Sequence, residues 1–187
     1  MRSTVPLFVL AIAAAAPAIA TETISVPSFH SVELRGGGDV SLLPGPIQRV
    51  TILSGSTQFT RIYMLRDGKL RIDACNAGCP RNYNLKIRIE SPHAPDIAIS
   101  GGGTIVAGNG FAPQGQLSAA INGGGTIDVR AVEAGEVSAA VNGGGKIAVR
   151  PRATLSAAVH GGGEVRYAGN PQVSMAVAGG GDVRRID

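Results

Sequence analysis

Tryptophan is absent from this 187-residue chain, and aromatic residues make up only 4% of it. Charged residues are also few, at 16%, with a formal net charge of +4. Without a basic stripe and interleaved aromatic residues, the chain lacks what nucleic-acid binding requires. Hydrophobic residues still reach 44%, which excludes a disordered polar chain. The length allows one domain or two small ones.

Long apolar runs are missing except at the N-terminus. There Arg2 precedes an apolar run, Val5–Ala16, which is shorter than the roughly 20 residues that span a bilayer. Small residues at Ala18 and Ala20 then match a signal-peptidase site. We therefore predict a signal peptide at 1–20, cut between Ala20 and Thr21; the alternative is a single membrane anchor. The mature chain is expected to have no transmembrane span and to be periplasmic, on the outer surface or extracellular.

Cysteine occurs only twice, at Cys75 and Cys79. In an oxidising compartment an even number of cysteines at short spacing predicts a disulfide. A Cys-x-x-Cys redox motif is one residue shorter, and a zinc site would need further ligands that the three histidines do not supply at a suitable spacing. We expect no metal and no cofactor.

Glycine, by contrast, is abundant, with 27 residues, and much of it lies in triplets. The triplets are 36–38, 101–103, 123–125, 143–145, 161–163 and 179–181. From the second triplet onward they begin 22, 20, 18 and 18 residues apart, and a period near 20 is typical of solenoids. The flanking residues alternate with period two, as strands do. A dinucleotide fingerprint would need a helix after the glycines, and Lys146 disfavours a calcium-binding repeat.

Aligned on the triplets, the flanks form aliphatic columns. One runs through Leu117, Val137, Leu155 and Val173, and another through Ile127, Ile147, Val165 and Val183. Stacked coils would bury these columns together. We predict an all-β, single-domain β-helix or solenoid at 21–187, with coils of about 18–22 residues that are irregular over 21–90 and regular over 91–187. Its corners are predicted to be glycines that accept no branched side chain, centred on Gly37, Gly102, Gly124, Gly144, Gly162 and Gly180.

Two segments resemble a known family. The family is the "putative auto-transporter adhesin, head GIN domain" family of exported bacterial proteins. Its start is similar to the segment Phe29-x-x-Val32-x-Leu34-x-Gly-Gly-Gly-Asp39-Val40 of this chain. Its end, just before the final coil, is similar to the run from Val165 to Pro171. The resemblance covers roughly 29–186. Family members often have Ser-Gly-Ala-Ser steps where this chain has three glycines. The resemblance implies a β-helical fold outside the cytoplasm and no catalytic residues that could be carried over.

Three functions compete. The first is a noncatalytic scaffold or adhesion-like module that binds an envelope protein or a polysaccharide. The second is a polysaccharide lyase or hydrolase, and the third is a sensory or regulatory periplasmic domain. An enzyme would need convergent carboxylates. The carboxylates of the regular coils are expected to occupy different columns or non-adjacent rungs: Asp128, Glu133, Glu136, Glu164 and Asp182.

The outward positions favour the first function. Small residues in two columns predict a flat, weakly charged wall without a concave site: Ser118, Ser138, Ser156 and Ser174 beside Ala120, Ala140, Ala158 and Ala176. His160 is expected to be an outward or corner residue. At the C-terminal end Arg184 and Arg185 would discourage strand pairing, so we expect a monomer or small oligomer.

Overall fold

Period-two alternation decides the local structure. In the segment before the third triplet, Leu117, Ala119 and Ile121 are at most 2% exposed. The intervening Ser118 and Ala120 are partly exposed. Because successive side chains of a strand point to opposite faces, such a segment buries one face and leaves the other in water.

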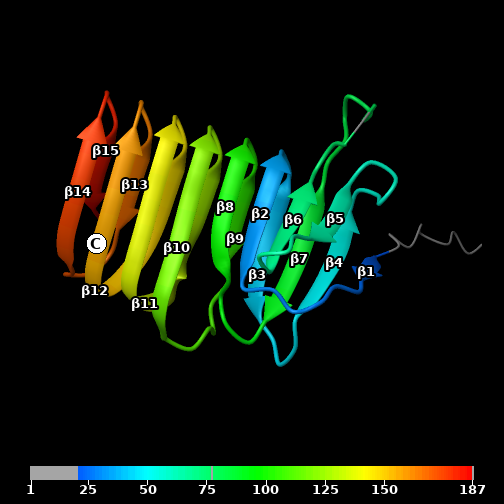
Figure 1. Ribbon diagram of the computed structural model, residues 1–187, viewed down its shortest axis with the longest axis horizontal. Coiled ribbons are helices and arrows are strands. Elements are labelled where there is room, and N and C mark those ends of the chain that lie inside the picture. Colours follow the sequence, from blue (N-terminus) through cyan, green and yellow to red (C-terminus); the bar gives the residue numbers. More distant parts are fainter. Residues whose placement is uncertain (1–20, 77, 187) are drawn as a thin grey trace, which may run out of the picture.

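The computed structural model describes residues 21–76 and 78–186, and every regular element within these ranges is a β-strand. The all-β prediction is confirmed. The strands belong to one 15-stranded sheet, whose members stand side by side along the long axis of the molecule (Figure 1). The predicted signal peptide lies outside the described residues. The described part of the chain has no helix with the length and hydrophobicity needed to cross a membrane.

Strands that precede the triplets form one series, which we call the pre-triplet ladder. Its order is β5 (Arg61–Met64), β6 (Lys69–Asp73), β2 (Ser31–Gly36), β8 (Asp96–Gly101), β10 (Gln114–Gly123), the last part of β11 (Thr126–Gly143), the last part of β12 (Lys146–His160) and β14 (Gln172–Ala178). All of these pairs are parallel except that of β5 with β6.

Strands that follow the triplets form the post-triplet ladder. Its order is β1 (Glu22–Ile24), β4 (Arg49–Ser54), β7 (Lys86–Ser91), β3 (Asp39–Pro44), β9 (Thr104–Ala107), the first parts of β11 and β12, β13 (Glu164–Tyr167) and β15 (Asp182–Arg185). In this ladder β1 and β4 pair antiparallel with their neighbours, and the remaining pairs are parallel. A strand of each ladder and the triplet that joins them make one rung.

The rungs do not follow chain order at the N-terminal end. Strand β2 pairs with both β6 and β8, and β3 pairs with both β7 and β9. The first rung of the chain is therefore enclosed by two later ones. The chain runs outward after β3, builds the β6–β7 rung, and then crosses to the other side of the first rung. From β8 onward each rung stacks on its predecessor, in the register that the aligned triplets predict.

The inward side chains of both ladders form one hydrophobic cluster. The columns that the sequence predicts are present. Ile127 of β11 pairs with Ile147 of β12, and Leu117 of β10 pairs with Val137 of β11. All four are at most 3% exposed. Each rung contributes a few aliphatic side chains, and only their stacking removes them from water.

The corner glycines are constrained at different positions from those predicted. The first glycine of a triplet has a positive φ, as at Gly143, where φ is 126° and an added Cβ would lie 2.5 Å from the carbonyl oxygen of Gly123. A Cβ on the third glycine, Gly145, would lie 2.6 Å from Cγ2 of Ile121. The middle glycines do lie at the bends, but Gly144 has no positive φ, and nothing lies within 4 Å of its Cβ position.

The prediction that the middle glycine excludes side chains is therefore wrong about the position. Like Gly144, four more of the middle glycines face open space: Gly37, Gly124, Gly162 and Gly180. The sixth, Gly102, has one atom in ordinary contact distance, the Gly36 oxygen at 3.6 Å. The middle residue points out of the corner. Its neighbours pack against the previous rung, and this is where a Cβ would clash.

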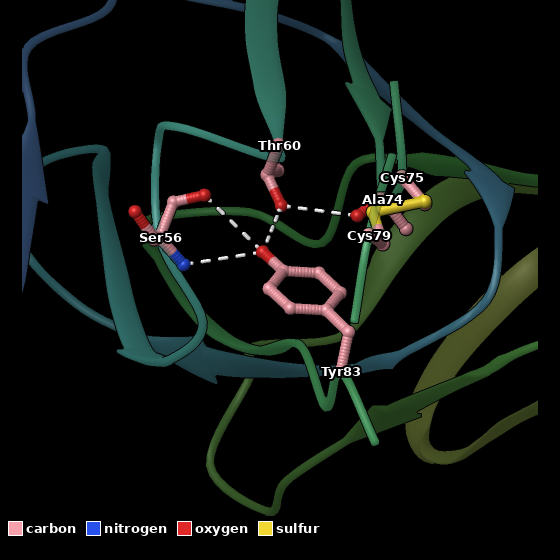
Figure 2. Close-up of a disulfide and its surroundings, with 6 residues drawn as sticks. All are labelled: Ser56, Thr60, Ala74, Cys75, Cys79 and Tyr83. Atoms are coloured by element: carbon pink, nitrogen blue, oxygen red, sulfur yellow. Dashed lines mark hydrogen bonds between the residues drawn. A yellow bond between two sulfur atoms is a disulfide. The ribbon is translucent and has the colours of Figure 1, made fainter. Parts of the chain in front are cut away.

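One rung replaces its triplet by a longer loop, which contains the disulfide. The loop joins β6 to β7, and Cys75 and Cys79 within it are bonded, as predicted (Figure 2). Tyr83 anchors the loop: its hydroxyl lies 2.5 Å from Oγ1 of Thr60 and accepts a hydrogen bond from the Ser56 amide. The Thr60 hydroxyl in turn donates to the carbonyl of Ala74. Buried hydroxyls with complete hydrogen bonding hold the loop in place at this end of the stack.

Candidate binding groove

The outward face of the pre-triplet ladder consists of small side chains in register. Serines pair with serines from β10 to β14, alanines with alanines beside them, and Asn122 pairs with Asn142, which pairs with His160. Neighbouring parallel strands lie about 4.8 Å apart, so each group recurs at that interval along the stack. His160 is exposed and in register with Ala178, which confirms its predicted outward position.

A groove of about 560 Å³ runs along the serine column. One side is the serine column itself, headed by Asp96, and between the polar columns lie the strand segments of Leu117, Val137, Leu155 and Val173, whose side chains point inward to the core. A third column completes the lining: Gln116, Glu136, Thr154 and Gln172. We call this feature the serine groove. The expectation of a flat wall without concavity is wrong here, because the longer polar side chains of the third column rise beside the short serines.

Most of the polar groups of the groove are uncharged. Asp96 accepts a hydrogen bond from the backbone amide of Ser118 at 2.8 Å, and Gln116 donates to Glu136 at 3.3 Å. The serine hydroxyls form no hydrogen bond within the described part of the chain. These hydroxyls are therefore free to donate to, or accept from, a molecule that enters the groove.

The outward face of the post-triplet ladder is different, because it is charged and internally paired. Arg130 donates two side-chain hydrogen bonds to Asp128, at 2.9 and 2.6 Å, and these bonds lower the pKa of the Asp128 carboxyl. The ion pair with Arg166, whose Nε lies 2.7 Å from Oε1 of Glu164, lowers the pKa of the Glu164 carboxyl.

The expectation that the carboxylates of the regular coils occupy different columns or non-adjacent rungs is wrong for one pair. Glu164 and Asp182 are register partners on adjacent rungs, and Arg184 contacts both, at 2.6 and 3.7 Å. The arginines lower the pKa of the Glu164 carboxyl, whereas a general acid needs a carboxyl with a raised pKa. The described residues contain no group of three or more His, Cys, Asp or Glu side chains that could hold a metal ion.

Sequence reasoning found the serine column but not the polar column opposite it. The third column was visible in the alignment, since each of its members stands directly before an aliphatic column residue: Gln116, Glu136, Thr154 and Gln172. Side-chain length was the missing signal. Because these four side chains are larger than serine, and three of them are also longer, the space between the two columns becomes a groove.

Comparison with known proteins agrees with the family resemblance. Residues 110–171 match the model of the family described as "Putative auto-transporter adhesin, head GIN domain". The match confirms the predicted resemblance over these residues. Comparison with curated proteins gave no match.

Several solved structures are similar in outline. One is a putative adhesin from Bacteroides fragilis, with 18% identity, a TM-score of 0.44, and coverage of 89% of this chain and 96% of that one. Another is a "putative lipid binding protein" from Parabacteroides distasonis, with 16% identity, a TM-score of 0.41, and coverage of 90% and 96%. A "putative cell adhesion protein" from Clostridium sporogenes has 9% identity, a TM-score of 0.36, and coverage of 89% and 97%.

Proposed function

We propose that this chain is an exported, noncatalytic β-solenoid that binds an envelope partner, a protein or a polysaccharide, through the serine groove. The observation that carries the proposal is the groove itself: two polar columns side by side on the outward face, repeated from rung to rung. A groove with a repeating set of hydroxyls and amides suits an extended partner that makes the same contacts several times. The family match is consistent with this role, since the family is described as an adhesin head.

Export is supported by the leader-like residues 1–20 and by the disulfide. The segment has the charge, apolar run and small residues of a signal peptide. The Cys75–Cys79 bond fits an oxidising compartment, because disulfides do not persist in a reducing cytosol. Both observations favour the periplasm or the cell exterior.

The solenoid part of the proposal is supported by the register of the regular rungs. Residues separated by one repeat are direct partners, as Val137 is of Leu117 and Leu155 is of Val137. Each rung thus repeats the path of the one before it. The groove runs across these rungs, so its length is set by their number.

The test is binding to a panel of neutral and acidic polysaccharides, together with capture from an envelope extract. The test variant is Ser138→Lys with Ser156→Lys, which puts two long charged side chains into the groove at exposed positions. The matched control is Ala148→Lys, on the outward face of the post-triplet ladder. We expect the groove variant to lose binding at least tenfold and the control to bind like the parent.

Two outcomes would count against the proposal. Equal binding by the groove variant and the parent would place the contact surface elsewhere. Cleavage of any polysaccharide by the parent, abolished by alanine at a single carboxylate, arginine or histidine, would favour the lyase or hydrolase instead.

A further inference from the structure

The C-terminal end of the stack is open. Along one inward column, Ala139 and Ala157 are 1% and 3% exposed, whereas the next residue, Met175 of β14, is 56% exposed. Along the neighbouring column Val159 is fully buried and Val177 is 43% exposed. These side chains point toward the core like those before them, and they are exposed because no described rung covers them.

The outer edges of the last two strands also lie unpaired among the described residues. Within the residues that the structure describes, β14 pairs with β12 alone and β15 with β13 alone. The seven residues of β14, Gln172–Ala178, include no charged residue and no proline. Natural edge strands are usually protected by such residues, and an uncharged exposed edge favours pairing with another strand.

Of the two arginines expected to block this edge, Arg184 is turned away from it, and Arg185 donates to Asn170 at 3.5 Å. Arg184 forms ion pairs with Glu164 at 2.6 Å and with Asp182 at 3.7 Å. Glu164 belongs to β13, the strand before β15, so Arg184 leans back along the outward face and not over the open end. The expected protection of this edge by Arg184 is therefore absent from the observed geometry.

We propose that the open end binds a second copy of this chain, end to end about a two-fold axis. Such an axis lays β15 antiparallel to its counterpart. Because side chains alternate between faces, the register must match inward with inward residues. A register centred on Val183 pairs inward residues with inward residues. The same register places Asp182 opposite Arg184 of the second copy, and Arg184 opposite Asp182 of the second copy. Opposite charges directly across antiparallel strands are favourable.

The neighbouring registers do not have this charge complementarity. A shift of one residue in each copy toward the C-terminus sets Arg184 against Arg184, and a shift toward the N-terminus sets Asp182 against Asp182. The sequence Asp-Val-Arg of 182–184 is thus complementary to itself in one antiparallel register. This complementarity, together with the exposed core residues, identifies a second copy as the occupant.

The opposite end of the stack is a poor match for the open end. Its outermost strands, β5 and β1, have four and three residues, and both run antiparallel to their neighbours. A head-to-tail contact would also leave a further open end and continue into a fibre, whereas a two-fold contact closes. The structure therefore favours a dimer.

Sedimentation equilibrium of the exported chain over a concentration series tests the proposal. We expect the parent to approach twice the chain mass and Met175→Lys to remain monomeric, because a buried unpaired lysine is costly. Met175 is already 56% exposed, so the variant should fold. The control is Ala140→Lys, an exposed outward position on an inner rung, which should dimerise like the parent.

Three results would overturn the dimer: a monomer at every concentration, a mass that grows beyond two chains, or a dimer that Met175→Lys does not weaken.

A charge swap between positions 182 and 184 tests the register of the two β15 strands. Arg184→Asp should weaken the dimer about tenfold, since it replaces two ion pairs by two repulsions. The double variant Asp182→Arg with Arg184→Asp should restore the affinity to within about threefold, and failure to restore it would overturn the register.

Discussion

The two ladders of this protein share an interior and differ in their outward faces. Inward, both present aliphatic columns that are almost completely buried. Outward, the regular rungs of the pre-triplet ladder show serine, alanine and asparagine, whereas the post-triplet ladder shows Asp128 paired with Arg130 and Glu164 paired with Arg166 and Arg184. One backbone path supports both surfaces.

This difference shows which positions the fold restricts. An inward residue must fit its column, because the next rung packs on it. An outward residue meets solvent and its register neighbours, so the fold accepts a hydroxyl, an amide or an ion pair there. The contrast between the two outward faces is therefore a property of the surfaces and not of the scaffold.

The corner joins the two ladders, and breaking it should damage both. Gly143→Val is expected to lower the free energy of unfolding by about 3 kcal/mol or more, because it combines a positive φ with a clash against the Gly123 carbonyl. Chemical denaturation measures the loss. Gly144→Val is the control and should lose less than about 1 kcal/mol, since its Cβ position is open. Equal losses at both positions would contradict the assignment of the constraint to the first glycine.

The shared interior should respond equally on both sides. Ile121→Ala in the pre-triplet ladder and Ile127→Ala in the post-triplet ladder each remove a side chain that is at most 2% exposed. Each should cost about 2–5 kcal/mol through lost burial and a residual cavity. Urea denaturation of the two variants should agree within about 1 kcal/mol. If one variant were near neutral, that ladder would not form part of the common core.

Acid should distinguish the outward faces. The folded-state pKa of Glu164 lies below its ordinary value of 4.5, chiefly because of the close contact with the Arg166 guanidinium. A depressed carboxyl pKa stabilises the fold above the unfolded-state pKa, and this stability is lost as the pH falls through the folded-state value. Glu164→Gln should therefore be less stable than the parent by roughly 0.5–1 kcal/mol at pH 7, a gap that closes on acidification below about pH 4.5.

The matched control for this titration is Glu136→Gln, on the groove side. Glu136 accepts a hydrogen bond from Gln116 at 3.3 Å and is exposed. Because no arginine or lysine of the described residues forms an ion pair with it, we expect Glu136→Gln to change the free energy of unfolding at pH 7 by less than about 0.5 kcal/mol. A pH-independent deficit in Glu164→Gln would instead mean that the ion pairs of the post-triplet face do not contribute to stability.

The smallest effect is expected at the serine column. Ser138→Ala should change the free energy of unfolding by less than about 0.5 kcal/mol, because the hydroxyl is exposed and has no hydrogen-bond partner in the described chain. Differential scanning calorimetry would measure it. A larger loss would show that the serines serve the fold, and the case for a binding role of the column would weaken.

Sequence reasoning reached the architecture of the regular rungs because their signals are local and repeated. The triplets, the alternation and the aligned columns each recur. A strand assignment that is ambiguous at one rung is therefore resolved by the same pattern at the other rungs. The pairing of Leu117 with Val137 and of Ile127 with Ile147 follows directly from the alignment. The disulfide was accessible for a similar reason, since Cys75 and Cys79 are the only cysteines in the chain.

The less regular part was beyond this reasoning. Nothing in 21–90 repeats often enough to show that the β2–β3 rung is enclosed by β6–β7 on one side and β8–β9 on the other. Strand pairing between segments far apart in sequence depends on which exposed edges compete for a partner. That competition is settled only when the whole sheet assembles.

The sequence by itself determined the all-β class, the inward columns, the positions of the bends and the disulfide, because side-chain alternation, glycine and cysteine act locally. The tertiary structure decided which glycine of each triplet is constrained, where a groove opens beside the serines, and that Arg184 joins Glu164 with Asp182. These features depend on the distance between side chains of adjacent rungs. That distance is fixed by the hydrogen-bonded stacking of strands, and no single segment contains it.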